Sequence, residues 1–234
     1  MRIMSFNTQH CKNFIEQKID YNIMAQVIKD YNPDIVGLNE MRNKGILPGF
    51  DNQTEILSQL TWIENYFFAK AIDVGVGKNP YGNGLLSKFK IVKSEVIPVP
   101  DPVHKADAPF KYETRCLLKA ELENGLTVLV IHMGLNTDEQ ENAVKVVLQH
   151  IKDEKCILMG DFNAIPSSEV LNPIREKLVD TATYFSEDKL SYPSDKPEMK
   201  IDYIFVSKDI EIISADIPHI IASDHRPHTA HISI

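Results

Sequence analysis

The sequence predicts an α/β fold, and three observations support this class. Short apolar segments of strand composition alternate with segments whose apolar residues recur at helical spacing. The chain has 234 residues, 43% of them hydrophobic, which suffices for one large domain with a substantial core. Residues 3–7 and 158–163 resemble each other, since both are apolar strands that end in Phe-Asn, and this repeat hints at two packed sheets. We therefore expect a single α/β domain over residues 1–234.

The first quarter of the chain is predicted to run strand, helix, strand, helix. Residues 2–6 have strand composition, and apolar residues at helical spacing predict a helix over residues 19–31 that ends before Pro33. Residues 34–38 then form a short buried strand, and residues 53–60 a short helix.

The middle of the chain is richer in strands, and the remainder returns to alternation. Gly125 indicates a hairpin turn between two of the middle strands. A capping box at residues 137–140 begins a helix that runs to about residue 151, and Ser167 caps another that runs to about residue 178. Predicted strands cover residues 85–87, 91–99, 115–122, 127–132 and 156–159, with a pair of strands at 203–206 and 210–215 and exposed loops at 101–112 and 185–200.

The charge balance argues against a general DNA-binding surface. The formal net charge is -8 and the pI is about 5.5, whereas a protein that binds duplex DNA usually presents a basic face to the phosphates. An acidic chain is better suited to a small or singly phosphorylated substrate.

Cysteine usage and the N-terminus indicate the compartment. The three cysteines, Cys11, Cys116 and Cys156, are widely spaced and form neither a disulfide framework nor a CxxC metal-binding motif. We therefore expect buried, reduced thiols and a cytoplasmic location. The first residues lack the pattern of a signal peptide, so secretion would require a leader that has been removed. No apolar run is long enough for a transmembrane segment, and no protein partner is evident.

Polar side chains follow the ends of several predicted strands. Strand ends are where an α/β sheet holds a site rigidly beneath exposed loops, so we expect these side chains to form one site. They are Asn7, Asn39-Glu40-Met41-Arg42, His132, Asp161-Phe162-Asn163, Asp202 and Ser223-Asp224-His225-Arg226-Pro227.

These residue types suit a hard cation. Carboxylate and amide oxygens are the ligands that Mg²⁺ prefers, with Mn²⁺ as a substitute, and no Cys/His pair has zinc-ligand spacing. His132 and His225 add groups that change charge near neutral pH. The oxygen donors are Glu40, Asp161, Asp224, Asn7 and Asn163.

Each of these residues also has an ordinary structural explanation. Asn7 and Asp161 suit turns, Glu40 suits a solvated strand end, and His132 could be a core histidine. Asp202 is harder to explain, because a carboxylate that opens a buried strand needs a partner. Separate structural explanations for the whole set are improbable.

The ordered set of motifs resembles that of the endonuclease/exonuclease/phosphatase superfamily, whose members have the fold of pancreatic deoxyribonuclease. The matching segments are residues 3–7, 34–40, 81–87, 160–163, 201–206 and 223–225, which span nearly the whole chain in the family's order. The resemblance implies a four-layer α/β sandwich in which two packed mixed β-sheets are flanked by helices.

The resemblance also implies roles for the metal-side residues. Glu40, with Asn7 nearby, would hold Mg²⁺ against a phosphate oxygen, and Asp224 would complete the metal environment. Asp161 would orient or deprotonate the attacking water, and Asn163 would position that water or the phosphate.

The remaining roles concern the phosphate. His225, braced by Asp202, would face the phosphorus, and His132 would donate to a non-bridging oxygen. Members of the superfamily often pair the His132 position with a carboxylate, but residues 77–80 here contain no acid, so proton donor and polar clamp both stay open for His132. Further phosphate-contact candidates are Asn83, Arg115 and Arg42, the last of which could instead pair with an acid.

The predicted function is metal-dependent hydrolysis of a phosphodiester or phosphomonoester, by water attack assisted by His and Asp. The substrate would be a phosphorylated small molecule, a lipid head group or a nucleic acid, and the charge favours the first two. Three alternatives stay open: a nuclease acting on DNA or RNA, a non-catalytic phosphate-ligand binding module, and a lipid phosphodiesterase that binds surfaces through apolar residues 47–50.

Overall fold

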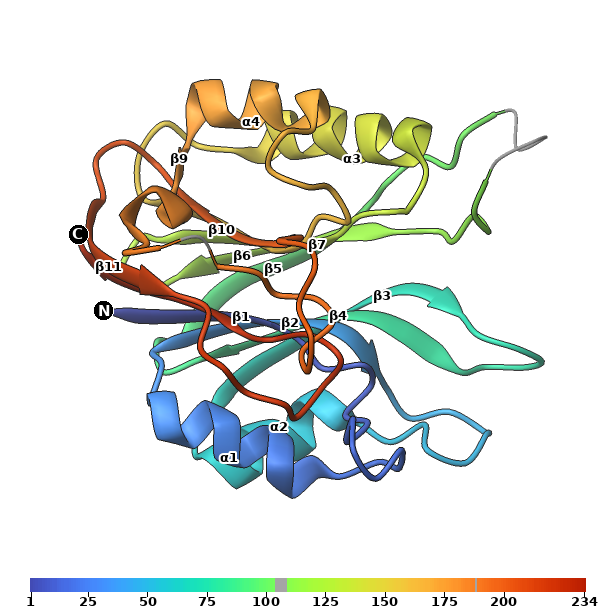
Figure 1. The fold of residues 1–234 in the computed structure, drawn as a ribbon. Coiled ribbons are helices and arrows are strands. Elements are labelled where there is room, and N and C mark those ends of the chain that lie inside the picture. The colour runs from blue at the N-terminus through green and yellow to red at the C-terminus, as the bar shows by residue number, and fades with distance from the viewer. Residues whose placement is uncertain (104–108, 188) are drawn as a thin grey trace.

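Two six-stranded sheets pack face to face between two layers of helices in the computed structural model (Figure 1). The structure describes residues 1–103, 109–187 and 189–234. Both sheets mix parallel and antiparallel pairs, which confirms the predicted four-layer α/β sandwich. In the described part of the chain, no helix is both long enough and apolar enough to span a bilayer.

The first sheet is built mainly from the N-terminal half of the chain, and two helices cover its outer face (Figure 1). Its strand order is β11-β12-β1-β2-β4-β3. The elements are β1 (Arg2–Asn7), α1 (Tyr21–Tyr31), β2 (Ile35–Arg42), α2 (Gln53–Thr61), β3 (Asn65–Asp73), β4 (Pro80–Ser87), β11 (Glu211–Asp216) and β12 (His228–Ser233).

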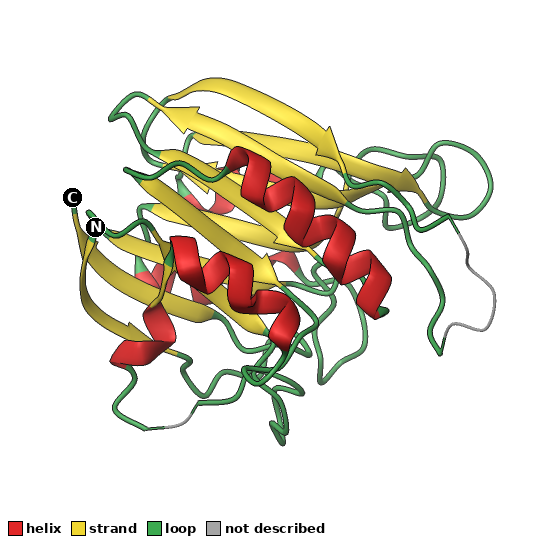
Figure 2. Ribbon diagram, turned by 90° about the horizontal axis from the view of Figure 1, so that it is seen from above, coloured by secondary structure: helices red, strands yellow, loops and turns green. Residues whose placement is uncertain are grey.

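The second sheet has the order β5-β6-β7-β8-β10-β9, and its own helical layer lies across the strands when the molecule is seen from above (Figure 2). Its elements are β5 (Ile91–Pro98), β6 (Cys116–Leu122), β7 (Thr127–His132), α3 (Thr137–His150), β8 (Cys156–Asp161), the 3-10 turn η1 (Glu169–Leu171), α4 (Asn172–Lys177), β9 (Val179–Asp180), the 3-10 turn η2 (Thr181–Tyr184) and β10 (Asp202–Val206).

The main core lies between the two sheets. Ile3 and Ile35 of the first sheet pack there with Val130 and Ile157 of the second, and all four are buried. Gly37 lies at a close approach of the two sheets, because a Cβ atom at this position would come 2.6 Å from Met159 Sδ. The absence of a side chain thus lets the two sheets meet beneath the site. All three cysteines are free and buried, as the sequence predicts.

The carboxyl ends of two parallel strand pairs meet at one edge of the sandwich. In the first sheet Asn7 lies in register with Asn39, and in the second His132 lies in register with Asp161. Asp202 pairs with Asp161 from the antiparallel side. The register of the strands therefore places the polar strand-end residues of both sheets side by side.

One predicted strand pairing is wrong. The segments 203–206 and 210–215 were expected to pair with each other, but β10 joins β8 in the second sheet while β11 joins β12 in the first. The partner of β11 is a C-terminal strand that the sequence analysis did not predict, and β3 was also missed. β3 is a partly exposed edge strand, and β12 lies inside the sheet but is rich in polar residues, so apolar alternation is weak in both.

Two helix starts also differ from prediction. The residue that caps α3 is Asn136, whose backbone N–H donates to Glu139 Oε2 at 3.2 Å, so the capping box begins one residue earlier than predicted. The helix expected after Ser167 is instead a 3-10 turn followed by the six-residue α4. Of the predicted loop over 101–112, residues 104–108 lie outside the described residues.

Candidate active site

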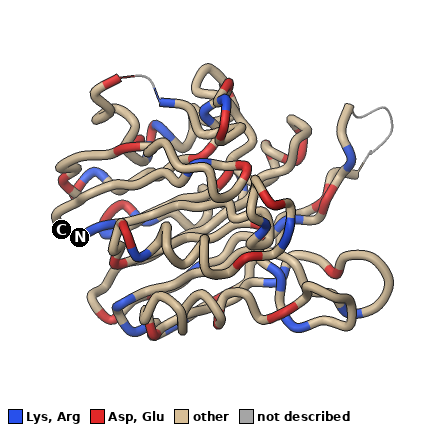
Figure 3. Tube along the Cα trace, turned by 60° about the horizontal axis from the view of Figure 1, so that its bottom comes forward, with Lys and Arg blue, Asp and Glu red and all other residues tan. Residues whose placement is uncertain are grey.

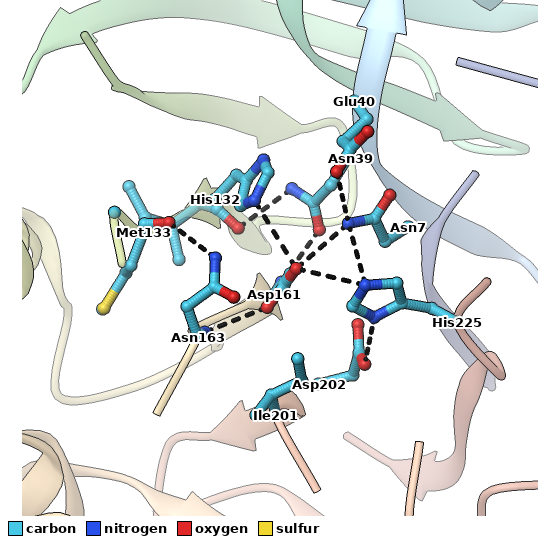
Figure 4. Close-up of polar contacts among 12 residues, drawn as sticks. Asn7, Asn39, Glu40, His132, Met133, Asp161, Asn163, Ile201, Asp202 and His225 are labelled. Atoms are coloured by element: carbon cyan, nitrogen blue, oxygen red, sulfur yellow. Dashed lines mark hydrogen bonds and ion pairs between the residues drawn. The ribbon is translucent and has the colours of Figure 1, made fainter. Parts of the chain in front are cut away.

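Strand-end side chains from both sheets converge on a cleft of about 270 Å³ at this edge (Figure 4). The cleft mixes acidic, basic, aromatic and apolar groups. It is lined by Glu40, Tyr81, Glu113, Arg115, His132, Leu135, Asp161, Asn163, Tyr192, Met199, Ile201, Asp224 and His225.

A buried row of Asp202, His225 and Asp161 forms the floor of the cleft. His225 Nδ1 lies 2.8 Å from Asp202 Oδ2, and His225 Nε2 lies 3.6 Å from Asp161 Oδ2. Burial alone would lower the pKa of His225, but the carboxylates of Asp202 and Asp161 outweigh it and raise that pKa to about 10. At neutral pH His225 is therefore an imidazolium whose orientation Asp202 sets.

The backbone at Gly160 sets the position of Asp161. Gly160 has a φ of 145°, and a Cβ atom there would lie 1.8 Å from the carbonyl oxygen of Ile131, so only glycine lets β8 pass so close to β7. The Asp161 N–H donates to Asn39 Oδ1 at 2.9 Å. Burial raises the pKa of Asp161 to about 7, although the His225 charge opposes this shift.

Glu40 enters the cleft from a bulge in β2. Its φ of 61° coincides with a register shift between Leu38 and Met41, and such a bulge re-aims one side chain out of the strand. Burial would raise the pKa of Glu40, but His10, whose Nδ1 lies 3.9 Å from Glu40 Oε2, and the nearby His132 and His225 lower it to about 2. Glu40 is therefore a stable anion at neutral pH.

Asn7 links the carboxylates. Its Nδ2 donates to Glu40 Oε1 at 3.2 Å and to Asp161 Oδ2 at 3.0 Å, while its Oδ1 accepts the backbone N–H of Gln9 at 3.1 Å (Figure 4). The amide nitrogen thus faces the cleft. Asn7 is thus a donor that bridges two acids in this structure, and its role as a metal ligand stays a prediction.

His132 and Asn163 close the opposite wall. His132 Nε2 lies 3.5 Å from Asp161 Oδ2, and its Nδ1 lies 3.0 Å from Arg115 Nη1. Burial and the Arg115 charge hold the pKa of His132 well below its usual range. Asn163 Nδ2 donates to the Met133 carbonyl at 2.9 Å, which leaves the Asn163 side-chain oxygen for the cleft.

The donor set fits a divalent cation. Glu40, Asp161 and Asp224 all line the cleft. Burial and the negative charge of Glu40 raise the pKa of the Asp224 carboxyl, although the His225 charge opposes this shift, so negative charge is crowded there. Ligand atoms of Asp161, Asp202 and His225 lie within 4.8 Å of one another, and the buried Asp202 Oδ1 has no hydrogen-bond partner. Asp202 already holds His225 Nδ1 at 2.8 Å, and a hard cation prefers oxygen, so the carboxylate oxygens are the donors in this cleft that suit a cation such as Mg²⁺.

Nine of the eleven residues singled out in the sequence meet at this site, and two do not reach the cleft. Both ends of the Asn83 amide form hydrogen bonds between the sheets. Its oxygen accepts from Asn39 at 2.8 Å, and its nitrogen donates to the Cys116 carbonyl at 3.0 Å. Arg42 lies over the Phe50 ring at 4.5 Å, and Phe50 is buried. The residues that meet are Asn7, Glu40, Arg115, His132, Asp161, Asn163, Asp202, Asp224 and His225.

Several lining residues were missed by the sequence analysis. The Tyr192 ring centroid lies 4.8 Å from that of His225, and Glu113 Oε1 lies 2.7 Å from Arg115 Nη1. Both come from segments without strand or helix periodicity, so no pattern predicted that they reach the cleft. Tyr81 lay within a matched motif, but only the structure shows it in the cleft wall, beside Glu40.

Comparisons with known proteins agree with this geometry. Residues 4–225 match the model of the Endonuclease/Exonuclease/phosphatase family. None of the curated proteins compared with the chain is significantly similar to it. The chain belongs to the endonuclease/exonuclease/phosphatase family, whose members are phosphoester hydrolases.

Solved structures share the fold at low sequence identity. An endonuclease/exonuclease/phosphatase from Beutenbergia cavernae DSM 12333 is 21% identical with a TM-score of 0.82, over 99% of this chain and 71% of that one. The mannosyl-6-phosphatase of Bacteroides thetaiotaomicron VPI-5482 is 16% identical with a TM-score of 0.78, over 100% of both chains. The human Nocturnin catalytic domain is 22% identical with a TM-score of 0.73, over 100% of this chain and 94% of that one.

Proposed function

We propose that the chain is a Mg²⁺-dependent hydrolase that cleaves the phosphate ester of a small or lipid-like molecule. The observation that carries the proposal is the buried Asp202–His225–Asp161 row facing Glu40 across the cleft. It combines an oriented imidazolium, a carboxyl with a pKa of about 7 and an anionic wall. General acid–base hydrolysis needs the first two, and a cation site needs the third.

Four side chains of the cleft would have separate roles in the hydrolysis. Asp161, whose pKa is about 7, would accept a proton from the attacking water, which Asn163 would help to position. The imidazolium of His225 would offset charge that develops on the phosphoryl group. Asn7 would hold Glu40 and Asp161 at a fixed separation through its two donated hydrogen bonds.

Glu40 and Asp224 are the carboxylates that would hold Mg²⁺, or Mn²⁺ in its place. When bound, the cation supplies Lewis-acid stabilisation of the phosphoryl and leaving oxygens. The crowding of these carboxylates supports the assignment, because a divalent charge would relieve their mutual repulsion.

Size and charge support a small substrate over duplex DNA. The cleft volume of about 270 Å³ suits a compact phosphate ester, and acids stand among its lining residues. In the view of Figure 3, Lys and Arg positions are interspersed with Asp and Glu along the chain. A phosphatase of a sugar phosphate among the structural neighbours agrees with this choice. Free, buried thiols support a cytoplasmic site of action.

The deciding experiment is a panel of phosphate esters assayed with Mg²⁺ and with EDTA. It contains p-nitrophenyl phosphate, bis-(p-nitrophenyl) phosphate, inositol phosphates, sphingomyelin, short RNA and plasmid DNA. Turnover confined to the small or lipid esters and abolished by EDTA is the expected result. Plasmid nicking at low enzyme concentration would establish a nuclease instead, and silence on every ester with both Mg²⁺ and Mn²⁺ would favour a binding module.

A further inference from the structure

The buried ring of His132 is held by a cation. Arg115 Nη1 lies 3.0 Å from His132 Nδ1, and the Arg115 guanidinium is itself held by Glu113, whose Oε1 lies 2.7 Å from the same nitrogen. The His132 side chain is only 7% exposed, and that of Arg115 only 11%. On the other side of the ring, His132 Nε2 lies 3.5 Å from Asp161 Oδ2.

The chemistry of these two side chains determines where the proton sits. A guanidinium has five N–H donors, no acceptor, and does not lose its charge in proteins. His132 Nδ1 must therefore accept the hydrogen bond from Arg115, which leaves that nitrogen without a proton. A neutral imidazole with an unprotonated Nδ1 carries its proton on Nε2, the nitrogen that faces Asp161 and the cleft.

We propose that Arg115 is a positioning residue that keeps His132 a neutral donor with its proton on Nε2. His132 then donates a hydrogen bond to a phosphoryl oxygen and does not protonate the leaving group, since a neutral imidazole would have to become an imidazolate to do so. This consequence for the reaction rests on the proposed function. It favours the polar clamp over the proton donor for His132, and it assigns to Arg115 the support of His132 where the sequence predicts a phosphate contact.

Nuclear magnetic resonance of the full chain tests the protonation pattern without any activity. Nitrogen-15 labelling of His and Arg in the metal-free protein should show His132 protonated on Nε2 alone at neutral pH. A nitrogen–nitrogen coupling should appear across the hydrogen bond between Arg115 Nη1 and His132 Nδ1. The His132→Gln variant assigns the signals among the eight histidines. A His132 ring protonated on Nδ1, or on both nitrogens, would overturn the proposal.

Arg115 variants test whether this residue is the cause. Arg115→Met removes the donors, so the coupling should vanish and the two neutral forms of His132 should exchange. Arg115→Lys keeps a positively charged N–H donor group and should preserve the Nε2–H form. If His132 were unaltered in Arg115→Met while KM for the ester rose, Arg115 would be a direct phosphate contact and the inference would be wrong.

Leaving-group dependence tests the consequence for catalysis. p-Nitrophenyl phosphate expels a good leaving group that needs no proton, whereas phenyl phosphate expels a poorer one. We expect His132→Ala to lower kcat by the same factor on both esters, and His132→Gln, which keeps an N–H donor, to recover part of the loss. A loss about 10-fold or more larger on phenyl phosphate would identify His132 as a general acid. If the wild type hydrolysed none of the esters, the proposed function would be wrong. The nuclear magnetic resonance result would still determine the protonation state of His132.

Discussion

Asp161 lies at the centre of the polar contacts of the cleft, since its side chain contacts Asn7, His132 and His225 at once. Asp161→Asn keeps the shape of the side chain but removes the group that would accept a proton from water. We expect kcat to fall by ~10² to 10⁴-fold on any ester that the wild type hydrolyses.

The matched control for this variant is Asp209→Asn, because Asp209 is an exposed aspartate bonded to the Lys155 backbone away from the cleft. Its kcat should stay within about twofold of the wild type, as for most surface changes distant from a site. Near-wild-type turnover by Asp161→Asn itself would remove Asp161 from the catalytic assignment.

At the scale of one element, β8 depends on Gly160. A Cβ atom at this position would lie 1.8 Å from the Ile131 carbonyl oxygen, so Gly160→Ala must push β8 away from β7. We expect the free energy of unfolding to fall by ~2 kcal/mol or more, as for other changes that force backbone strain. Urea unfolding followed by circular dichroism measures this loss. An unchanged midpoint would show that the two strands can separate without cost.

Strand β12 contains a histidine that makes stability depend on pH. His228 is fully buried between Thr181 and the Asp202 carbonyl, and burial holds its pKa well below the usual 6.5. The unfolded chain therefore binds a proton below pH 6.5 that the folded chain does not, so stability should fall as the pH drops below 6.5, by at most about 1.4 kcal/mol per pH unit.

The variant His228→Asn isolates this contribution. Its side chain does not titrate, so thermal unfolding measured between pH 7 and pH 5 should show a shallower decline than the wild type, even if its stability at pH 7 is lower. Parallel declines for the two proteins would assign the acid sensitivity to other groups.

At the scale of the whole molecule, the proposed cation site lies where the two sheets meet, because Glu40 belongs to the first sheet and is linked through Asn7 to Asp161 of the second. Binding of Mg²⁺ should therefore stabilise the packed sandwich and raise its Tm. At a Mg²⁺ concentration about 100-fold above Kd, the gain in the free energy of unfolding should be about 2.7 kcal/mol.

Scanning calorimetry with Mg²⁺ and with EDTA measures this gain, and Glu40→Gln is the variant that should lose most of it while remaining folded. An equal rise in Tm for Glu40→Gln and the wild type would place the cation elsewhere on the molecule.

Residue order and local pattern determined much of this protein by themselves. Apolar periodicity predicted most helices and strands, and polar residues at strand ends predicted which side chains meet, from Glu40 and His132 to Asp161 and His225. These inferences succeed because burial of one face and exposure of a strand end are local properties of a short segment.

Only the tertiary structure decided which sheet each strand joins and which way each amide points. β10 and β11 follow one another in the chain yet extend different sheets, because strand choice depends on partners far away in sequence. Asn83 serves the contact between sheets, Asn7 turns its nitrogen to the acids, and Arg115 meets His132, since each orientation is set by hydrogen bonds to residues many positions distant. A pattern along the chain records the type of a side chain, but its hydrogen-bond partners exist only once the two sheets have packed.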